Sequence, residues 1–138
     1  WWNQNQIQQH NNCYNYACNY STDTFAQPGL ASGASTSTWQ CNTVIASAAA
    51  DNLEDSPAAN NNCPDEGHLV ALVMWPGHDF HWYRKGRNGK WSHKMGDKPA
   101  TNLDNNGNLI DDPRTANRGS YSDFCTFMVV KQGHIKIK

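Results

Sequence analysis

The sequence predicts an α+β fold in which N-terminal helices pack on an antiparallel β-sheet. Two observations predict it. Helix-capping residues and helically spaced apolar residues lie within the first 54 residues, whereas β-rich runs separated by glycine-containing turns fill the stretch after residue 67. Strands joined by short turns pair antiparallel. The 138 residues suit one core, so we assign a single domain to residues 11–138, preceded by an N-terminal arm over residues 1–10.

The first half of the chain reads as two helices separated by polar segments. Residues 1–10 are rich in amides and read as an extended arm or a covering strand. A helix begins near residue 11 and ends by residues 21–22, before the Pro28-Gly29 pair. Residues 27–40 are loop by composition. A second helix is expected over residues 42–54, where apolar residues repeat at helical spacing, and a polar loop follows over residues 55–64.

The second half reads as a run of strands. Residues 68–75 form the longest apolar run, and a turn at 76–77 ends it, so we expect a central strand there. The next strands are expected over residues 79–84 and 90–94, joined by a turn at 87–89. After another turn at 105–108, residues 122–131 supply a further strand, and residues 135–138 are a candidate for the last one.

Composition favours a secreted protein. The net charge of −1 gives no argument for nucleic acid or an anionic membrane, and no apolar run approaches the roughly 20 residues that span a bilayer. The chain starts at Trp1 rather than Met, as expected of a processed product or a fragment. Five cysteines also suit an oxidising compartment. Asn19 opens the sequon Asn-Tyr-Ser and is a candidate glycosylation site.

The cysteine count leaves one thiol over after two disulfides. Cys13 and Cys18 are five residues apart, about 140° round a helix, so they cannot bond each other within one helix. We take Cys13 as the free thiol, because it alone follows helix-capping residues, although it could also be half of a disulfide. The other four cysteines are expected in disulfides whose three possible pairings stay open: Cys18, Cys41, Cys63 and Cys125.

Cys13 is also the candidate nucleophile. Asn11 or Asn12 can cap the helix that carries it, and a thiol in a first helical turn has its pKa lowered by the dipole and the unpaired amides. His68 opens the central strand, and His81 lies on the next strand beyond the turn. If the hairpin folds about residues 76–77, these two histidines fall within a few residues of cross-strand register. A thiol, an imidazole base and an orienting group make a catalytic triad.

This arrangement resembles papain-like cysteine peptidases, and most closely the compact type that cuts cell-wall peptides with a Cys-His-His triad. Asn11-Asn12-Cys13-Tyr14 departs from the Asp-Cys-Ser-Gly opening of that type. The resemblance implies a papain-like core and a secreted cysteine hydrolase of peptide or amide bonds, with Cys13 as nucleophile, His68 as base and His81 orienting it. Asn11 or Asn12 would help to hold the oxyanion, Trp82 and Trp91 would form the walls of a substrate groove, and no cofactor is expected.

A second resemblance covers most of residues 11–130. Segments such as Asn12–Ala17, Phe80–Arg84 and Trp91–Lys94 look like those of small secreted proteins from bacteria and molluscs, some labelled insoluble shell-matrix proteins. This resemblance implies secretion and disulfides. It supports an alternative to the enzyme: a non-catalytic extracellular protein that self-associates or binds a matrix polysaccharide, with Trp1, Trp2 and the arm as contacts.

Other histidines and carboxylates give weaker patterns. His68 could instead be a strand-end residue bonded to a loop carbonyl, and His93 is expected to be exposed. His78 and His81, three residues apart in a strand, point to opposite faces and do not suit zinc. The stretch from Asp104 to Asn108 lacks the spacing of a calcium loop and reads as an Asn-Gly turn. No metal site is therefore predicted.

Overall fold

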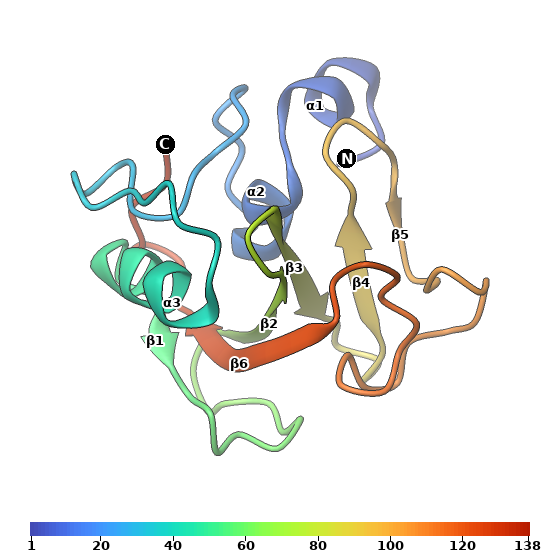
Figure 1. Cartoon of the computed structure of the whole chain (residues 1–138). Coiled ribbons are helices and arrows are strands. Elements are labelled where there is room, and N and C mark those ends of the chain that lie inside the picture. Colours follow the sequence, from blue (N-terminus) through green and yellow to red (C-terminus); the bar gives the residue numbers. More distant parts are fainter.

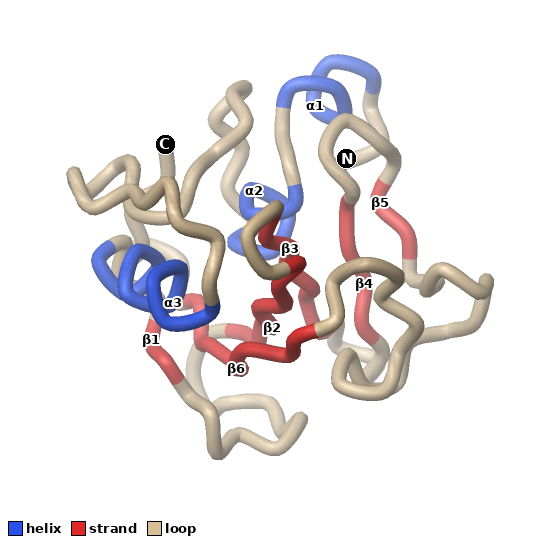
Figure 2. Tube along the Cα trace, viewed as in Figure 1, coloured by secondary structure: helices blue, strands red, loops and turns tan.

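Six strands form one antiparallel sheet, and two of the three short helices pack against it (Figure 1). The computed structural model describes all residues from 1 to 138. The strand order is β1-β6-β2-β3-β4-β5, and every neighbouring pair is antiparallel. The strands are β1 (Glu54–Asp55), β2 (His68–Trp75), β3 (Asp79–Lys85), β4 (Trp91–Lys94), β5 (Ala100–Thr101) and β6 (Asp123–Val130). Figure 2 shows how much loop connects these elements. The predicted α+β class and the four longer strands are confirmed.

The helices are α1 (Asn5–His10), α2 (Cys13–Cys18) and α3 (Cys41–Ala50). The last two confirm the predicted helices, although both end earlier than expected. The prediction of an extended arm or strand over residues 1–10 is wrong. Glutamine is a good helix former, and the segment also docks on the far hairpin: the Asn3 side chain accepts from the Ala100 backbone amide at 2.7 Å, and Gln8 Nε2 donates to Asp97 O at 3.2 Å.

Strand β2 is buried on both faces, which is why its sequence is a continuous apolar run rather than an alternating one. One face, with Val70 and Leu72, packs in a core with residues of α2 and α3. The other face, with Leu69 and Ala71, packs in a second core. The second core holds residues of the neighbouring strands and of the long loop before β6, among them Trp91, Ile110, Tyr121 and Phe127. The sheet therefore lies between helices and a loop.

The C-terminal segment is not a strand, so the candidate strand over residues 135–138 is wrong. Its alternating pattern has a different cause, because Ile135 and Ile137 are buried in the core shared with the helices. Isolated backbone bonds fasten the segment: Lys136 N donates to Asp51 O at 2.9 Å, and Gln27 N donates to Lys138 O at 3.2 Å. A period of two in a short segment records burial of alternate side chains, whether or not a ladder forms.

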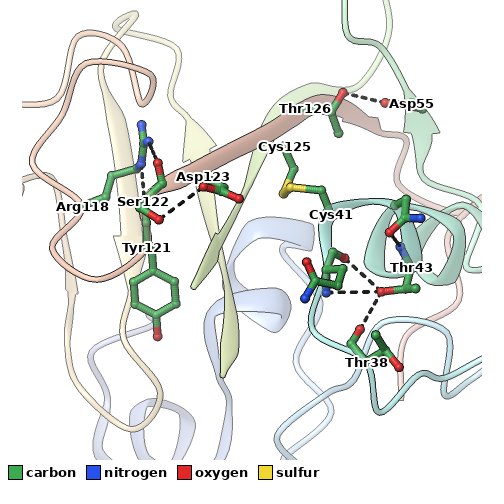
Figure 3. The surroundings of a disulfide bond; sticks show 12 residues. Thr38, Cys41, Thr43, Asp55, Arg118, Tyr121, Ser122, Asp123, Cys125 and Thr126 are labelled. Carbon is green, nitrogen blue, oxygen red and sulfur yellow. Dashed lines mark hydrogen bonds between the residues drawn. A yellow bond between two sulfur atoms is a disulfide. The ribbon is translucent and has the colours of Figure 1, made fainter. Parts of the chain in front are cut away.

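One disulfide joins the first residue of α3 to β6 (Figure 3). Cys41 and Cys125 approach to 5.2 Å between their Cα atoms, within the range that a disulfide requires. Cys13, Cys18 and Cys63 are free thiols. Cys13 is thus free as predicted, but the expectation that Cys18 and Cys63 are disulfide-bonded is wrong, because Cys18 is buried at the end of α2 and Cys63 lies on an exposed loop.

Candidate functional site

Cys13 is the first residue of α2, where the sequence predicted it. The side-chain oxygen of Asn12 accepts from the backbone amides of Tyr14 at 3.1 Å and Asn15 at 3.2 Å, and Asn15 Oδ1 accepts from the Asn12 amide at 2.9 Å. This reciprocal pair is a capping box. It fixes the direction in which the helix starts, and with it the position of the Cys13 side chain.

The Cys13 thiol lies beside the point where two strands separate. Pairing of β3 with β4 ends at Tyr83 and His93. The backbone amide of Trp82, the residue before Tyr83 on β3, is close enough to the Cys13 sulfur to lower the pKa of the thiol. Cys13 and His81 both line one cavity of about 400 Å³, which we call the thiol cavity. Its walls include Phe25, Trp39, Lys98 and Tyr121. The structure therefore brings Cys13 and His81 to one site.

His68 lies elsewhere. Its Nε2 lies 2.6 Å from the carbonyl oxygen of Ala17, at the opposite end of α2 from Cys13. In the β2–β3 hairpin His81 pairs with Val73, which is five residues from His68 and about 17 Å along the strand. The predicted triad of Cys13, His68 and His81 is therefore not assembled. His68 instead fits the alternative interpretation, a strand-end residue bonded to a backbone carbonyl.

His93, and not His68 as predicted, lies beside His81 in the structure. His81 Nε2 lies 2.8 Å from His93 Nδ1, and His93 Nε2 lies 2.8 Å from Leu103 O. The expectation that His93 is exposed is wrong, since the residue is buried. A hairpin folded at residue 88 pairs His93 with Tyr83, which shares a face with His81. The same register argument, applied to the second hairpin, would have found this pair.

The Leu103 carbonyl fixes the protons of both rings. A carbonyl only accepts hydrogen bonds, so Nε2 of His93 carries a proton. In the neutral ring Nδ1 then accepts, and the Nε2–H of His81 donates to it. This leaves Nδ1 of a neutral His81 unprotonated, on a side chain that lines the thiol cavity. The arrangement therefore leaves a hydrogen-bond acceptor on a residue that lines the same cavity as Cys13.

Burial sets the protonation states of Cys13 and His81. Desolvation raises the pKa of the Cys13 thiol to about 12, and backbone amides, chiefly that of Trp82, counter only part of this. The predicted lowering of the Cys13 pKa is therefore wrong, because α2 has only six residues and its dipole is outweighed by burial. Burial, followed by the proximity of His93, lowers the pKa of His81 well below 6.5. Both groups rest uncharged at neutral pH.

The residues predicted to bind substrate instead have structural roles, as hydrogen-bonded or buried side chains. The Asn11 side chain bonds to Ile7 O at 3.0 Å and accepts from the backbone amide of Thr22 at 2.9 Å. Asn12 caps α2 and donates to Ala26 O at 2.8 Å, so neither amide is free for an oxyanion. Trp82 and Trp91 are fully buried, on opposite faces of the sheet. The predicted groove walls are therefore wrong.

Lys94, next to His93, is a buried cation that the sequence analysis missed. Its Nζ donates to the backbone carbonyls of Gln8, Asn11 and Gly96. These carbonyls come from α1, from the residue before the α2 cap and from the loop after β4. Full burial of a lysine is rare unless its charge is compensated, and three carbonyl acceptors provide that compensation here. The ammonium thus holds the N-terminal segment against the edge of the thiol cavity.

A second surface gathers aromatic rings near the N-terminus, and we call it the aromatic face. Trp1, Trp2 and Tyr16 stack edge-on, with ring centroids 4.6 Å apart for the first pair and 5.5 Å for the second. Trp2 and Tyr16 are buried, whereas Trp1 is 62% exposed. An adjoining surface cavity of about 470 Å³ is lined by these rings and by Ser92 and Asn102 among others. No Asp, Glu, Lys, Arg or His side chain lines it.

Three further features concern glycosylation, metal binding and membrane crossing. Asn19 is exposed, caps α2 in a left-handed conformation with φ 52°, and stays a predicted glycosylation site. No group of three or more His, Cys, Asp or Glu side chains is placed to hold a metal ion. None of the helices has the length and apolar character that crossing a bilayer requires.

Comparison with known proteins finds one family relationship. Insoluble matrix shell protein 1 from Ruditapes philippinarum is 48% identical to this chain over 131 residues, which cover 94% of this chain and 85% of the relative. No family model matches the sequence. No solved structure matches it either.

Proposed function

Because this chain belongs to the family of insoluble matrix shell protein 1, we propose that it is a structural protein of an extracellular matrix. The observation that carries the proposal is the similarity to that relative along nearly the whole chain. The Cys41–Cys125 disulfide supports it, since such bonds persist in oxidising, extracellular settings. This is the non-catalytic alternative of the sequence analysis.

The aromatic face supports a polysaccharide as the matrix partner. An exposed indole offers a flat apolar surface with a polar edge, and the Asn102 and Ser92 side chains beside it can bond hydroxyl groups. Because no Asp, Glu, Lys, Arg or His side chain lines the adjoining cavity, the matching partner is an uncharged polymer. Trp1 is the ring with the most free surface on this face.

Co-sedimentation with an uncharged polysaccharide such as chitin tests this function. The Trp1→Ala variant should bind about tenfold more weakly, because it loses one aromatic stacking contact. Trp75→Ala is a matched control, since Trp75 is also partly exposed but stacks on His78 with centroids 4.8 Å apart, away from the aromatic face. Equal binding by the Trp1 variant and the parent would reject the aromatic face. Binding to no matrix polymer at all would reject the proposed function.

Self-association is the other part of the matrix proposal. The first ten residues are docked on the chain rather than extended, so contact between copies would use the exposed ring of Trp1 and not a free arm. Sedimentation velocity over a hundredfold concentration range checks this. A mass that grows with concentration in the parent and less in Trp1→Ala supports it, whereas a constant monomer mass excludes it.

A second candidate function, a thiol hydrolase, is favoured by one specific observation: the tautomer that the chain His81–His93–Leu103 imposes. With Nε2 occupied, His81 has only Nδ1 to offer as a base, and the side chain lines the same cavity as the thiol. This candidate replaces the predicted triad by Cys13, His81 and His93. It keeps the secreted cysteine hydrolase and the papain-like core as proposals, with a peptide or cell-wall peptide as substrate.

The proposed reaction starts from the neutral Cys13 thiol and the neutral His81 imidazole. As the Cys13 sulfur attacks a peptide carbonyl, the C–S bond forms and His81 Nδ1 takes the thiol proton. Collapse of the tetrahedral intermediate breaks the C–N bond, and His81 gives that proton to the departing amine. Water then attacks the thioester while His81 takes its proton. The C–S bond breaks, and the proton returns to sulfur. His93 is a positioning residue that accepts from the imidazolium of His81.

Hydrolysis of peptide amides and peptidoglycan fragments tests this candidate. Cys13→Ala should abolish turnover, and His93→Phe should lower kcat about 100-fold and shift the acidic limb of the pH profile, with KM little changed. His134→Gln, on an exposed histidine outside the thiol cavity, is the control. Turnover by Cys13→Ala at the parental rate would rule out the thiol as nucleophile.

A further inference from the structure

The largest cavity of the molecule, about 640 Å³, lies where β2 begins and where β3 and β6 end. We call it the basic cavity. Its lining carries four permanently or usually charged cations and two histidines, against a single carboxylate, that of Glu66. The basic residues are Arg84, Lys85, Arg87, Lys131, His68 and His134. Since the whole chain has a net charge of −1, this excess of positive charge is local.

Part of this charge is held in place. The Arg84 guanidinium stacks 3.9 Å from the Tyr16 ring centroid and donates through Nη1 to Tyr16 O at 2.9 Å. These contacts use one terminal nitrogen and leave Nη2 for another partner. His68, fixed by its bond to the Ala17 carbonyl, lines the same cavity. The residue that the sequence predicted to be catalytic is thus part of a basic wall.

The remaining cations differ in how far they are neutralised. Lys131 lies 2.9 Å from Glu54 and 3.6 Å from Glu66, so its charge is largely balanced within the chain. The Lys85 ammonium donates to the backbone and side-chain oxygens of Asn61, and its charge acts on Asp112; neither residue lines the cavity. Arg87 is exposed on the turn between β3 and β4, and it enters no ion pair. Arg84 and Arg87 therefore keep uncompensated charge at the cavity.

The field of these cations acts on the groups around them. Burial lowers the pKa of His68, and the positive charge of Arg84 lowers it further. The cavity volume is typical of sites that take a whole ligand, and it exceeds what one small inorganic anion fills. Guanidinium groups bind carboxylate and sulfate oxygens in a fork geometry. Size and charge together favour an anionic ligand larger than a simple ion.

We propose that the basic cavity binds the carboxylate or sulfate groups of an acidic polysaccharide. The proposal rests on the proposed matrix function, and it adds a second polymer contact on a different part of the surface from the aromatic face. Arg84 would hold one anionic group at the wall, and Arg87 would meet the polymer at the rim. The contact is electrostatic, so it should weaken steeply as the salt concentration rises.

The test compares binding to immobilised polygalacturonate, heparin and chitin at 50 and 300 mM NaCl. The parent should bind at least one of the two acidic polymers, and more weakly at the higher salt concentration. Arg87→Glu should weaken this binding about tenfold and leave chitin binding unchanged. Lys136→Glu is the matched control, because it makes the same charge change on an exposed lysine outside the cavity, and it should bind like the parent. Thermal unfolding of each variant verifies its fold.

The possible failures are distinguishable. Chitin binding without binding to either acidic polymer would overturn this inference and leave the matrix function standing. Binding to none of the three polymers would overturn both. Acidic-polymer binding that is equal in Arg87→Glu and the parent would show that the basic cavity is not the site. Free sulfate that competes as well as the polymer, at equal ionic strength and equal anion concentration, would assign the cavity to a small anion instead.

Discussion

The Nε2 atom of His81 lies 2.8 Å from Nδ1 of His93, and both rings are buried between β3, β4 and the loop before β6. Two adjacent imidazoles can form this hydrogen bond only if at least one of them is neutral, because one ring nitrogen must accept. The Leu103 carbonyl orients the pair, and burial keeps both rings uncharged. Several properties of the folded chain depend on this neutrality.

Stability should fall as the pH drops from 7 to 5. The pKa of His81 is well below 6.5 in the folded chain, mainly because of burial, whereas the unfolded chain keeps about 6.5. The unfolded state therefore binds the proton first, and stability present above pH 6.5 is lost below it. One histidine that stays neutral to pH 5 contributes about 2 kcal/mol to this loss. Urea unfolding at both pH values measures it. A flat profile would contradict buried neutral rings.

The capping box of α2 should be worth more than an ordinary cap. Asn12→Ala removes the acceptor of two helix amides and leaves the buried Ala26 carbonyl without its donor. We expect the free energy of unfolding to fall by about 2–3 kcal/mol. Asn42→Ala, on an exposed residue of α3, should cost about 0.5 kcal/mol or less. Chemical denaturation of the two variants compares them. Equal small effects would show that Asn12 does not set the helix start.

The Cys41–Cys125 disulfide closes a sequence separation of 84 residues. Replacing both cysteines by serine should lower the free energy of unfolding by about 4–5 kcal/mol, because the unfolded chain gains the entropy of an open loop. Denaturant midpoints with and without the substitutions measure this. Cys63→Ser, on an exposed free thiol, should leave stability unchanged. A double variant as stable as the parent would show that the bond is absent in solution.

Thiol labelling should separate the three free cysteines. Iodoacetamide at pH 8 should modify Cys63 quickly, because it is exposed, and Cys13 slowly, because burial raises its pKa to about 12 and leaves almost no thiolate. Cys18 should also be slow, because burial raises its pKa well above 9.0. Mass spectrometry of native and denatured protein should count one and then three modified sites. Fast native labelling of Cys13 would contradict its buried, protonated state.

Local signals predicted much of the fold. The cap at Asn12, the apolar run of β2 and the glycine turns at Gly77 and Gly89 are each encoded within a few residues, and the structure places elements there as expected. The helical α1 was missed because its amide-rich sequence shows no apolar period. Its position depends on contacts with β5 and with the loop before it, which are distant in sequence.

The site was harder to predict because it depends on register and on burial together. Placing His68 beside His81 required the hairpin to pair residues that are five positions apart in the actual ladder. The same arithmetic on the next hairpin places His93 correctly, but a neighbouring lysine suggested an exposed strand end. Lys94 is instead fully buried, on carbonyls from three segments. No local sequence pattern predicts a set of acceptors that comes from three separate segments.

The ammonium of Lys94 also determines how the chain would carry a mechanical load. Tension applied at Trp1 passes through α1 to the carbonyls that this charge holds, and from there into β4, an interior strand of the sheet. The amino end of the protein is therefore fastened to the sheet in two steps, first by the neutral bonds between Asn3 and Ala100 of β5 and then by the charged contact of Lys94. In a stretched film or layer the neutral bonds would open first, the Lys94 contact next, and the strands would separate only afterwards.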